Sequence, residues 1–219
     1  MNKKIVLFDI DYTVFDTRTF RVNLYELLSE KLGYKNKSNF VDLAKKVEAD
    51  TRKQEGYFKP STFLELLKNE TKTKISSNEL EDIFYDESLY IKSLYEGAKS
   101  VFQELVIKKN IQINIFSTGE KKFQMQKITA LTDMLMIDNL HIYVDKLKKL
   151  KEVLQQYEDY HIYMVDDFPI VLKEAKQFNK NITTIWVNRG IRIEDEELIK
   201  SFKVDYIIKK LEEIIPLVV

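Results

Sequence analysis

Acidic, hydroxyl and cationic side chains follow four short apolar runs of this chain. The four segments are Asp9-Ile-Asp11, Ser117-Thr118-Gly119, Asp145-Lys146 and Asp166-Asp167. Carboxylates that come together repel one another unless a cation binds between them, and a set of oxygen ligands suits Mg²⁺. A carboxylate next to a bound cation can also attack a phosphoryl group and form an acyl-phosphate. These residue types therefore predict phosphoryl chemistry with a divalent metal ion.

Each segment offers a different part of such a reaction. Lys146 can screen the approach of a carboxylate to an anionic phosphoryl group, and the Ser117 hydroxyl with the Gly119 backbone can hydrogen-bond phosphate oxygens. Asp11 is placed to protonate the leaving group and then to activate water. Taken singly these signals are weak, because Ser117 can simply cap the following helix and Lys146 is one of many lysines.

Strands and helices alternate after residue 97, and this alternation places the four segments at strand ends. The expected strands cover residues 4–8, 111–116, 141–144, 161–165, 182–187 and 206–208, and the expected helices cover residues 98–108, 121–131, 147–157 and 169–178. Strand–helix alternation predicts a parallel sheet with helices on both faces. The predicted fold class is α/β, with a doubly wound, Rossmann-like parallel-sheet core. Ligands bind at the carboxyl ends of such strands, so the four segments should meet at one edge.

Residues 17–94 show helical periodicity and no convincing strand. One apolar stripe runs from Phe20 to Leu32 and ends at Gly33, and others cover residues 40–47, 62–67 and 76–84. The last two have the spacing of a capping box, at Thr62–Glu65 and Ser76–Glu79. We therefore expect a core domain formed by residues 1–16 and 93–219, and an inserted all-helical cap domain at residues 17–92.

The composition excludes several classes of protein. The chain has 219 residues with 35 basic and 35 acidic side chains, and this zero net charge argues against a nucleic-acid or membrane-surface partner. The absence of Cys excludes thiolate chemistry, and the two histidines, His141 and His161, are too few for a multi-His zinc centre. No stretch of about 18 residues is free of charge, so a membrane span is not expected. A cytoplasmic protein is the default expectation.

The same four segments resemble the motifs of the haloacid dehalogenase superfamily, in the same order and over essentially the whole chain. Asp9-Ile-Asp11-Tyr-Thr13 is similar to the first motif, Asp-x-Asp-x-Thr after the first strand. Similarity to the second, third and fourth motifs is carried by Phe116-Ser117-Thr118-Gly119, Val144-Asp145-Lys146 and Met164-Val165-Asp166-Asp167. Tyr95-Glu-Gly97 resembles the segment that re-enters the core after a helical cap.

This resemblance implies a role for each residue. Asp9 would be the nucleophile and Asp11 the general acid and base. The Asp9 carboxylate, the Asp11 backbone carbonyl and Asp166 or Asp167 would hold Mg²⁺. The residues that would bind the transferring phosphoryl group are Ser117, Thr118, Gly119 and Lys146. In this superfamily an Asp at the second position of the first motif goes with phosphatases and phosphomutases, whereas the dehalogenases carry another residue there.

Two features depart from the pattern of the superfamily. Val165 stands where the fourth motif commonly has Gly, so the choice between Asp166 and Asp167 as the direct metal ligand is open. Lys148 and Lys149 compete with Lys146 for the third motif, and Lys146 is preferred because it directly follows the strand.

The sequence thus predicts a Mg²⁺-dependent phosphatase that acts on a small phosphorylated metabolite through an aspartyl-phosphate on Asp9. The helical cap would close over the site, exclude water and select the substrate. A phosphomutase and a non-catalytic binding protein with this fold remain alternatives. A phosphorelay receiver domain is rejected, because its phosphorylated Asp follows a middle strand, where this chain has Ser117-Thr118. The cap aromatics Tyr57, Phe58 and Tyr85 are expected in the core more than at the substrate.

Overall fold

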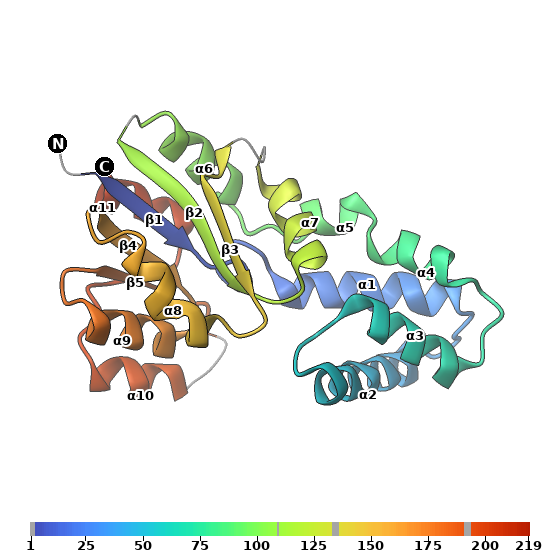
Figure 1. Ribbon diagram of the computed structural model, residues 1–219. Coiled ribbons are helices and arrows are strands. Elements are labelled where there is room, and N and C mark those ends of the chain that lie inside the picture. The colour runs from blue at the N-terminus through green and yellow to red at the C-terminus, as the bar shows by residue number, and fades with distance from the viewer. Residues whose placement is uncertain (1–2, 109, 133–135, 191–193) are drawn as a thin grey trace.

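A six-stranded parallel sheet forms the centre of the protein in a computed structural model that describes residues 3–108, 110–132, 136–190 and 194–219. Its strands are β1 (Lys4–Phe8), β2 (Ile111–Thr118), β3 (Asn139–Tyr143), β4 (His161–Asp166), β5 (Thr183–Val187) and β6 (Tyr206–Ile208). They pair in the order β3-β2-β1-β4-β5-β6 (Figure 1). The predicted doubly wound α/β fold is confirmed, and the sheet extends from β1 first toward β3 and then, on the other side, toward β6.

Helices cover both faces of the sheet because the side chains of each strand alternate between them. On β1, Ile5 and Leu7 belong to one apolar cluster with side chains of α8 (Lys146–Gln155), α9 (Pro169–Phe178) and α10 (Glu194–Ser201). Val6 and Phe8 point to the other face and pack with α6 (Ala98–Val106), the 3₁₀ helix Leu211–Ile214 and α11 (Ile215–Val218). Since these four β1 side chains are fully buried on two opposite faces, β1 is the central strand on which the site is built.

Five helices fill residues 17–92 and extend away from the sheet (Figure 1). They are α1 (Thr17–Lys31), α2 (Lys37–Glu55), α3 (Pro60–Thr71), α4 (Ser77–Phe84) and α5 (Glu87–Lys92). The ring centres of Phe20 and Phe123 are 5.6 Å apart. Phe123 belongs to α7 (Lys121–Leu131). Apolar packing therefore joins this helical segment to α7, the helix that follows β2.

Helix starts in this segment follow local chemistry, with one difference from the sequence prediction. The capping box of Ser76 and Glu79 at α4 is confirmed. The box predicted at Thr62 and Glu65 is wrong, because α3 begins two residues earlier at Pro60, whose fixed φ suits the first turn. The Thr62 hydroxyl instead donates to Glu55 at 2.6 Å.

The order of the strands places three strand ends side by side. β1 lies between β2 and β4, and the chain changes direction across the sheet at this point. In open parallel sheets ligands bind at such a switch point, outside the carboxyl ends of the strands. Asp9, Ser117 and Asp166 stand at the ends of these three strands. Among the described residues, no helix has the length and hydropathy needed to cross a bilayer.

Candidate active site

A cavity of about 520 Å³ opens between the carboxyl ends of the strands and the helices α1, α2 and α7. Seven of the eight predicted site residues line it, and the eighth, Asp166, is fully buried next to them. The seven are Asp9, Asp11, Ser117, Thr118, Gly119, Lys146 and Asp167. A cavity of this size suits a small organic molecule.

Lys146 bridges the carboxylates of Asp9 and Asp166. Its Nζ lies 2.6 Å from Asp9 Oδ1 and 2.6 Å from Asp166 Oδ2, and all three side chains are buried. Burial raises the pKa of Asp166 to about 7, with the charge of Asp9 adding to this effect and that of Lys146 opposing it. Burial likewise raises the pKa of Asp9. The position of Lys146 at the first turn of α8 therefore brings its ammonium, and not that of Lys148 or Lys149, into the site.

The acidic residues form a set that fits a divalent cation. Carboxylate oxygens of Asp9, Asp166 and Asp167 lie within 4.8 Å of one another. The ammonium of Lys146 bridges two of these carboxylates, and the third, that of Asp167, adds another negative charge to the set. Oxygen ligands at this spacing suit Mg²⁺, which would supply the missing positive charge.

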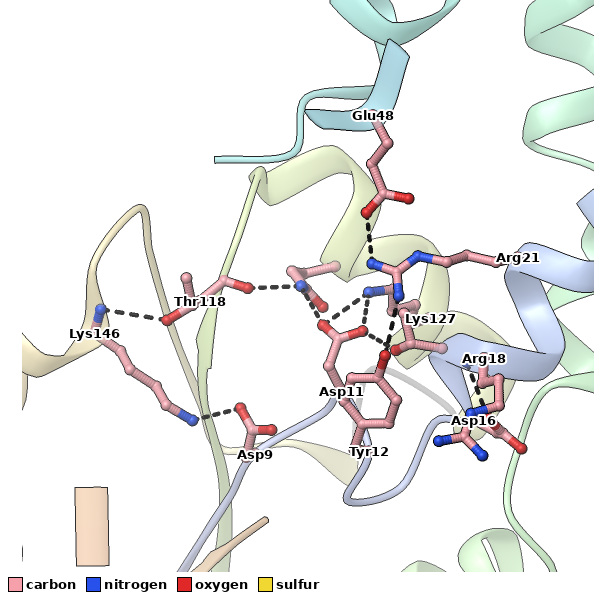
Figure 2. Close-up of polar contacts among 12 residues, drawn as sticks. Asp9, Asp11, Tyr12, Asp16, Arg18, Arg21, Glu48, Thr118, Lys127 and Lys146 are labelled. Carbon is pink, nitrogen blue, oxygen red and sulfur yellow. Dashed lines mark hydrogen bonds and ion pairs between the residues drawn. The ribbon is translucent and has the colours of Figure 1, made fainter. Parts of the chain in front are cut away.

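Asp11 has a different set of partners, shown in Figure 2. Lys127 Nζ lies 2.7 Å from its Oδ1 and 2.9 Å from its Oδ2, Gln124 Nε2 donates to Oδ2 at 2.8 Å, and the Thr17 hydroxyl also donates to Oδ1. Burial alone would raise the pKa of the Asp11 carboxyl, but Lys127 and these donors bring it below its ordinary value. The Asp11 side chain is thus directed to α7, so its backbone carbonyl is the group left for a metal.

Ser117 offers an unused hydroxyl. Its Oγ is buried and, within the part of the chain that the structure describes, has no hydrogen-bond partner. A buried polar atom without a partner is costly unless a ligand satisfies it. The Ser117 hydroxyl therefore fits an oxygen of a bound anion next to Asp9.

The contacts of Thr118 and Gly119 hold neighbouring parts of the backbone in place. The Thr118 hydroxyl accepts from the backbone N–H of Lys146 at 3.4 Å (Figure 2). The N–H of Gly119 donates to the carbonyl of Tyr143 at 2.8 Å. It is therefore engaged with β3, and the prediction that it binds a phosphate oxygen is wrong for this N–H group. Gly119 also has a φ of +143°, and a Cβ there would lie 2.6 Å from Gln124 Nε2. This turn therefore needs glycine.

Sequence reasoning missed Gln124 and Lys127. They lie three residues apart on one face of α7, and Lys127 is only 2% exposed. A buried lysine needs a charged partner, but nothing in the local sequence identifies the partner, which lies 116 residues earlier in the chain. The signal available was the i, i+3 spacing of two polar residues within the apolar face of the helix.

A second polar cluster, which the sequence analysis also missed, lies on the side of the cavity formed by α1 and α2. Arg21 of α1 donates from Nη2 to Glu48 Oε1 at 2.6 Å and from Nη1 to the hydroxyl of Tyr12 at 3.0 Å. Tyr12, between Asp11 and Thr13 of the first motif, has a left-handed backbone with φ 60°. Such a conformation in a residue other than Gly is strained and is typical of functional sites. Arg189 supports this turn by donating to the carbonyls of Tyr12 and Thr13.

Several other residues that the sequence analysis considered contribute to the fold. Asp16 caps α1, and Trp186 is buried. His141 Nε2 lies 2.7 Å from the hydroxyl of Tyr157. Two of the cap aromatics, Tyr57 and Phe58, are half-buried and line the cavity, so they are available to a substrate as well as to the core.

Solved structures of known proteins identify the fold of this chain. No protein-family model and no curated protein matches the sequence. Among solved structures, a haloacid dehalogenase-like hydrolase from Burkholderia xenovorans LB400 superposes with a TM-score of 0.75 at 21% identity over 98% of each chain. The HAD-hydrolase YfnB from Bacillus subtilis, bound to magnesium, gives 0.65 at 17% identity over 100% of this chain and 99% of its own.

A dehalogenase is also similar. L-2-haloacid dehalogenase from Xanthobacter autotrophicus, with chloropropionic acid covalently bound, superposes with a TM-score of 0.62 at 15% identity over 99% of this chain and 98% of its own. At these identities the comparisons establish the fold and leave the reaction open. The fold of this chain is that of the haloacid dehalogenase-like hydrolases, as the motif resemblance implied.

Proposed function

We propose that this protein is a Mg²⁺-dependent phosphatase that hydrolyses a small phosphorylated metabolite through an aspartyl-phosphate on Asp9. The observation that carries the proposal is the placement of Lys146 between Asp9 and Asp166, next to the unsatisfied hydroxyl of Ser117. A carboxylate, an ammonium and a hydroxyl without a partner among the described residues thus line one cavity. They suit a phosphoryl group, which carries negative charge on several oxygens.

The first half-reaction transfers the phosphoryl group to the protein. A carboxylate oxygen of Asp9 attacks phosphorus, a P–O bond to Asp9 forms, and the ester P–O bond breaks. The leaving alkoxide takes a proton from the Asp11 carboxyl. For this step Asp11 must carry a proton, which weakens its ion pair with Lys127.

The second half-reaction returns the protein to its starting state. Water attacks the phosphorus of the aspartyl-phosphate and gives a proton to the Asp11 carboxylate, the P–O bond to Asp9 breaks, and inorganic phosphate leaves. Lys146 stabilises the charge of the phosphoryl oxygens in both halves. Asp9, Asp166 or Asp167, and the Asp11 carbonyl would hold Mg²⁺, which supplies positive charge against the phosphoryl oxygens.

A dehalogenase is the competing reaction on this fold. A halide leaves as a stable anion and needs no proton, so the first step of a carbon–halogen reaction needs no acid beside the nucleophile. An alkoxide leaves only with help from an acid. Asp11 and the acidic set that fits a metal therefore favour phosphate esters.

The test is the release of inorganic phosphate from an aryl phosphate and a panel of small phosphate esters, with Mg²⁺ and with a chelator. Asp9→Asn should abolish release, since the amide keeps the shape but removes the nucleophile. Asp86→Asn is the matched control, because Asp86 caps α5 away from the cavity and Asn preserves the cap. Halide release from chloropropionate without any phosphate release would overturn the proposal.

A further inference from the structure

The cavity has a second end, opposite the strand ends, that the proposed reaction does not use. Its walls there come from α1, α2 and the residues after α2, and include Arg21, Arg52, Tyr57 and Phe58. The cavity volume of about 520 Å³ exceeds what a phosphoryl group alone occupies and leaves room for the rest of a substrate at this end.

Glu48 organises two guanidinium groups at this end. Its Oε1 accepts from Arg21 Nη2 at 2.6 Å and from Arg52 at 3.0 and 3.2 Å, and its Oε2 accepts from the hydroxyl of Tyr25 at 2.8 Å. The Glu48 side chain is 13% exposed, against 32% for Arg21 and 48% for Arg52. The Glu48 carboxylate is therefore engaged within the cluster, while both arginines are more exposed and line the cavity as well as the groove beside it.

The cluster carries one positive charge in excess. Two guanidinium groups share one carboxylate, and the other partner of Arg21 is the hydroxyl of Tyr12. Three of the five arginines of the chain, Arg18, Arg21 and Arg52, line this part of the cap or the groove beside it, although most basic positions in the sequence are Lys. Arginine is the residue that binds carboxylates and phosphates through two parallel hydrogen bonds.

We propose that Arg21 and Arg52 bind a second anionic group of the substrate, a carboxylate or a further phosphate, while its scissile phosphoryl group lies at Asp9. This inference rests on the proposed phosphatase function and names the class of substrate. Glu48 and Tyr12 are positioning residues that hold the Arg21 guanidinium in one orientation, which lowers the entropy lost on binding. The half-buried rings of Tyr57 and Phe58 then contact the carbon chain between the two anionic groups.

The experiment compares three phosphate esters of similar size: glycerol phosphate, with a neutral tail, phosphoglycerate, with a carboxylate, and propanediol bisphosphate, with a second phosphate. Wild-type protein should show the highest kcat/KM on one of the two doubly anionic esters, and which one identifies the second group. Arg21→Met should raise KM for that ester by about 10- to 100-fold and leave glycerol phosphate within about twofold, since the lost contact is a charge-assisted hydrogen bond.

Arg18→Met is the matched control. It removes the same charge from the same helix, but Arg18 lines only the outer groove, so all three KM values should stay unchanged. Arg52→Met should shift KM in the same direction as Arg21→Met. Because the Arg52 side chain is half-exposed, this variant tests the site even if Arg21→Met does not fold. A thermal midpoint for each variant separates unfolding from lost binding.

The two proposals fail in different ways. Equal kcat/KM on all three esters, or an equal loss on all three in Arg21→Met, overturns the second anionic site and leaves the phosphatase standing. If no ester releases phosphate, calorimetric binding of the same three to Asp9→Asn still decides the question. Tighter binding of a doubly anionic ester that is lost in Arg21→Met supports the site, and equal binding of all three refutes it.

Discussion

The ammonium of Lys127 lies 2.7 Å from Oδ1 and 2.9 Å from Oδ2 of Asp11, and joins the helix after β2 to the turn after β1. Lys127 is 2% exposed and lies 3.9 Å from the ring centre of Phe123, so an apolar surface surrounds most of it. Asp11 is the carboxylate that compensates its charge. The proposed acid and base of the reaction is therefore held by a residue that lies in none of the four motif segments.

Replacing Lys127 tests this link. Lys127→Met leaves the Asp11 carboxylate with Thr17 and Gln124 but without a cation, and we expect a loss of about 1–3 kcal/mol in the free energy of unfolding. Turnover should fall more than KM changes, because Asp11 acts in both proton transfers. Lys127→Arg should recover part of kcat.

Urea denaturation and steady-state kinetics measure both effects. Lys122→Met is the control on the same helix, at a side chain that is 63% exposed, and should change stability by no more than about 0.5 kcal/mol. A Lys127→Met variant with wild-type kcat would show that Lys127 does not contribute to the reaction.

Removal of Asp166 should weaken metal binding. Its Oδ2 contacts Lys146, its Oδ1 accepts from the N–H of Phe168 at 2.9 Å, and it belongs to the acidic set with Asp9 and Asp167. We expect Asp166→Asn to weaken Mg²⁺ binding at least about tenfold in a calorimetric titration, since one anionic oxygen ligand is lost. Mg²⁺ should also raise the thermal midpoint of the wild-type protein more than that of the variant. An unchanged titration would assign the metal to Asp167 instead.

Glu48 should make the helical segment sensitive to acid. Burial alone would raise its pKa, but Arg21, the Tyr25 hydroxyl and Arg52 bring it below the ordinary value of 4.5. A carboxyl whose pKa is lower in the folded state stabilises above its unfolded pKa, and this contribution is lost as the pH falls through the folded value. Glu48→Gln should therefore destabilise the protein at pH 7 and have a smaller effect below about pH 4.

Urea denaturation of both proteins at several pH values measures the difference in unfolding free energy. A difference that is the same at neutral and acid pH would show that the charge of Glu48 does not stabilise the fold.

Tyr157 should be important for stability and not for turnover. Its hydroxyl accepts from Asn114 Nδ2 at 2.7 Å and lies 2.7 Å from His141 Nε2, in a buried place away from the residues that line the cavity. Tyr157→Phe removes the partner of both groups, and an unsatisfied buried polar group costs about 1–3 kcal/mol. We expect that loss in urea denaturation together with an unchanged kcat. A fall in kcat at wild-type KM would contradict the structural role given to His141.

Much of the site could be predicted because its main residues stand at strand ends. The short apolar runs at β1 and β4 identify buried strands, and parallel pairing then brings Asp9 and Asp166 to one edge whatever the rest of the chain does. The bounds of β1, α7, α9 and β6 agree with the sequence prediction. The helix α10 was missed, since no apolar stripe of helical spacing was recognised between residues 187 and 206.

The contacts that could not be predicted depend on tertiary packing. Lys127 and Arg21 look like ordinary charged residues of amphipathic helices, and only the packing of α7 and α1 against the strand ends gives them buried partners. The error at Thr62 has a local cause, because Pro60 competes with a capping box for the start of α3 and wins. Periodicity predicts the faces of a helix, but not which distant residue a face meets.

Gly119→Ala tests how the turn after β2 controls Asp11. A Cβ at this position would lie 2.6 Å from Nε2 of Gln124, the atom that donates to Asp11 Oδ2 at 2.8 Å. The methyl group must displace the Gln124 side chain, so we expect a fall in kcat as well as a loss of about 1–3 kcal/mol from backbone strain at φ +143°.

Gly33→Ala is the matched control, because it has a left-handed φ of +72° but nothing within 4 Å of an added Cβ. It should lose stability and keep its kcat. In the double variant Gly119→Ala with Gln124→Ala, the clash is gone and the contact to Asp11 is already absent. Its kcat should therefore equal that of Gln124→Ala alone, since both changes act through one contact. Additive losses in kcat would mean that Gly119 affects the reaction by a route that does not pass through Gln124.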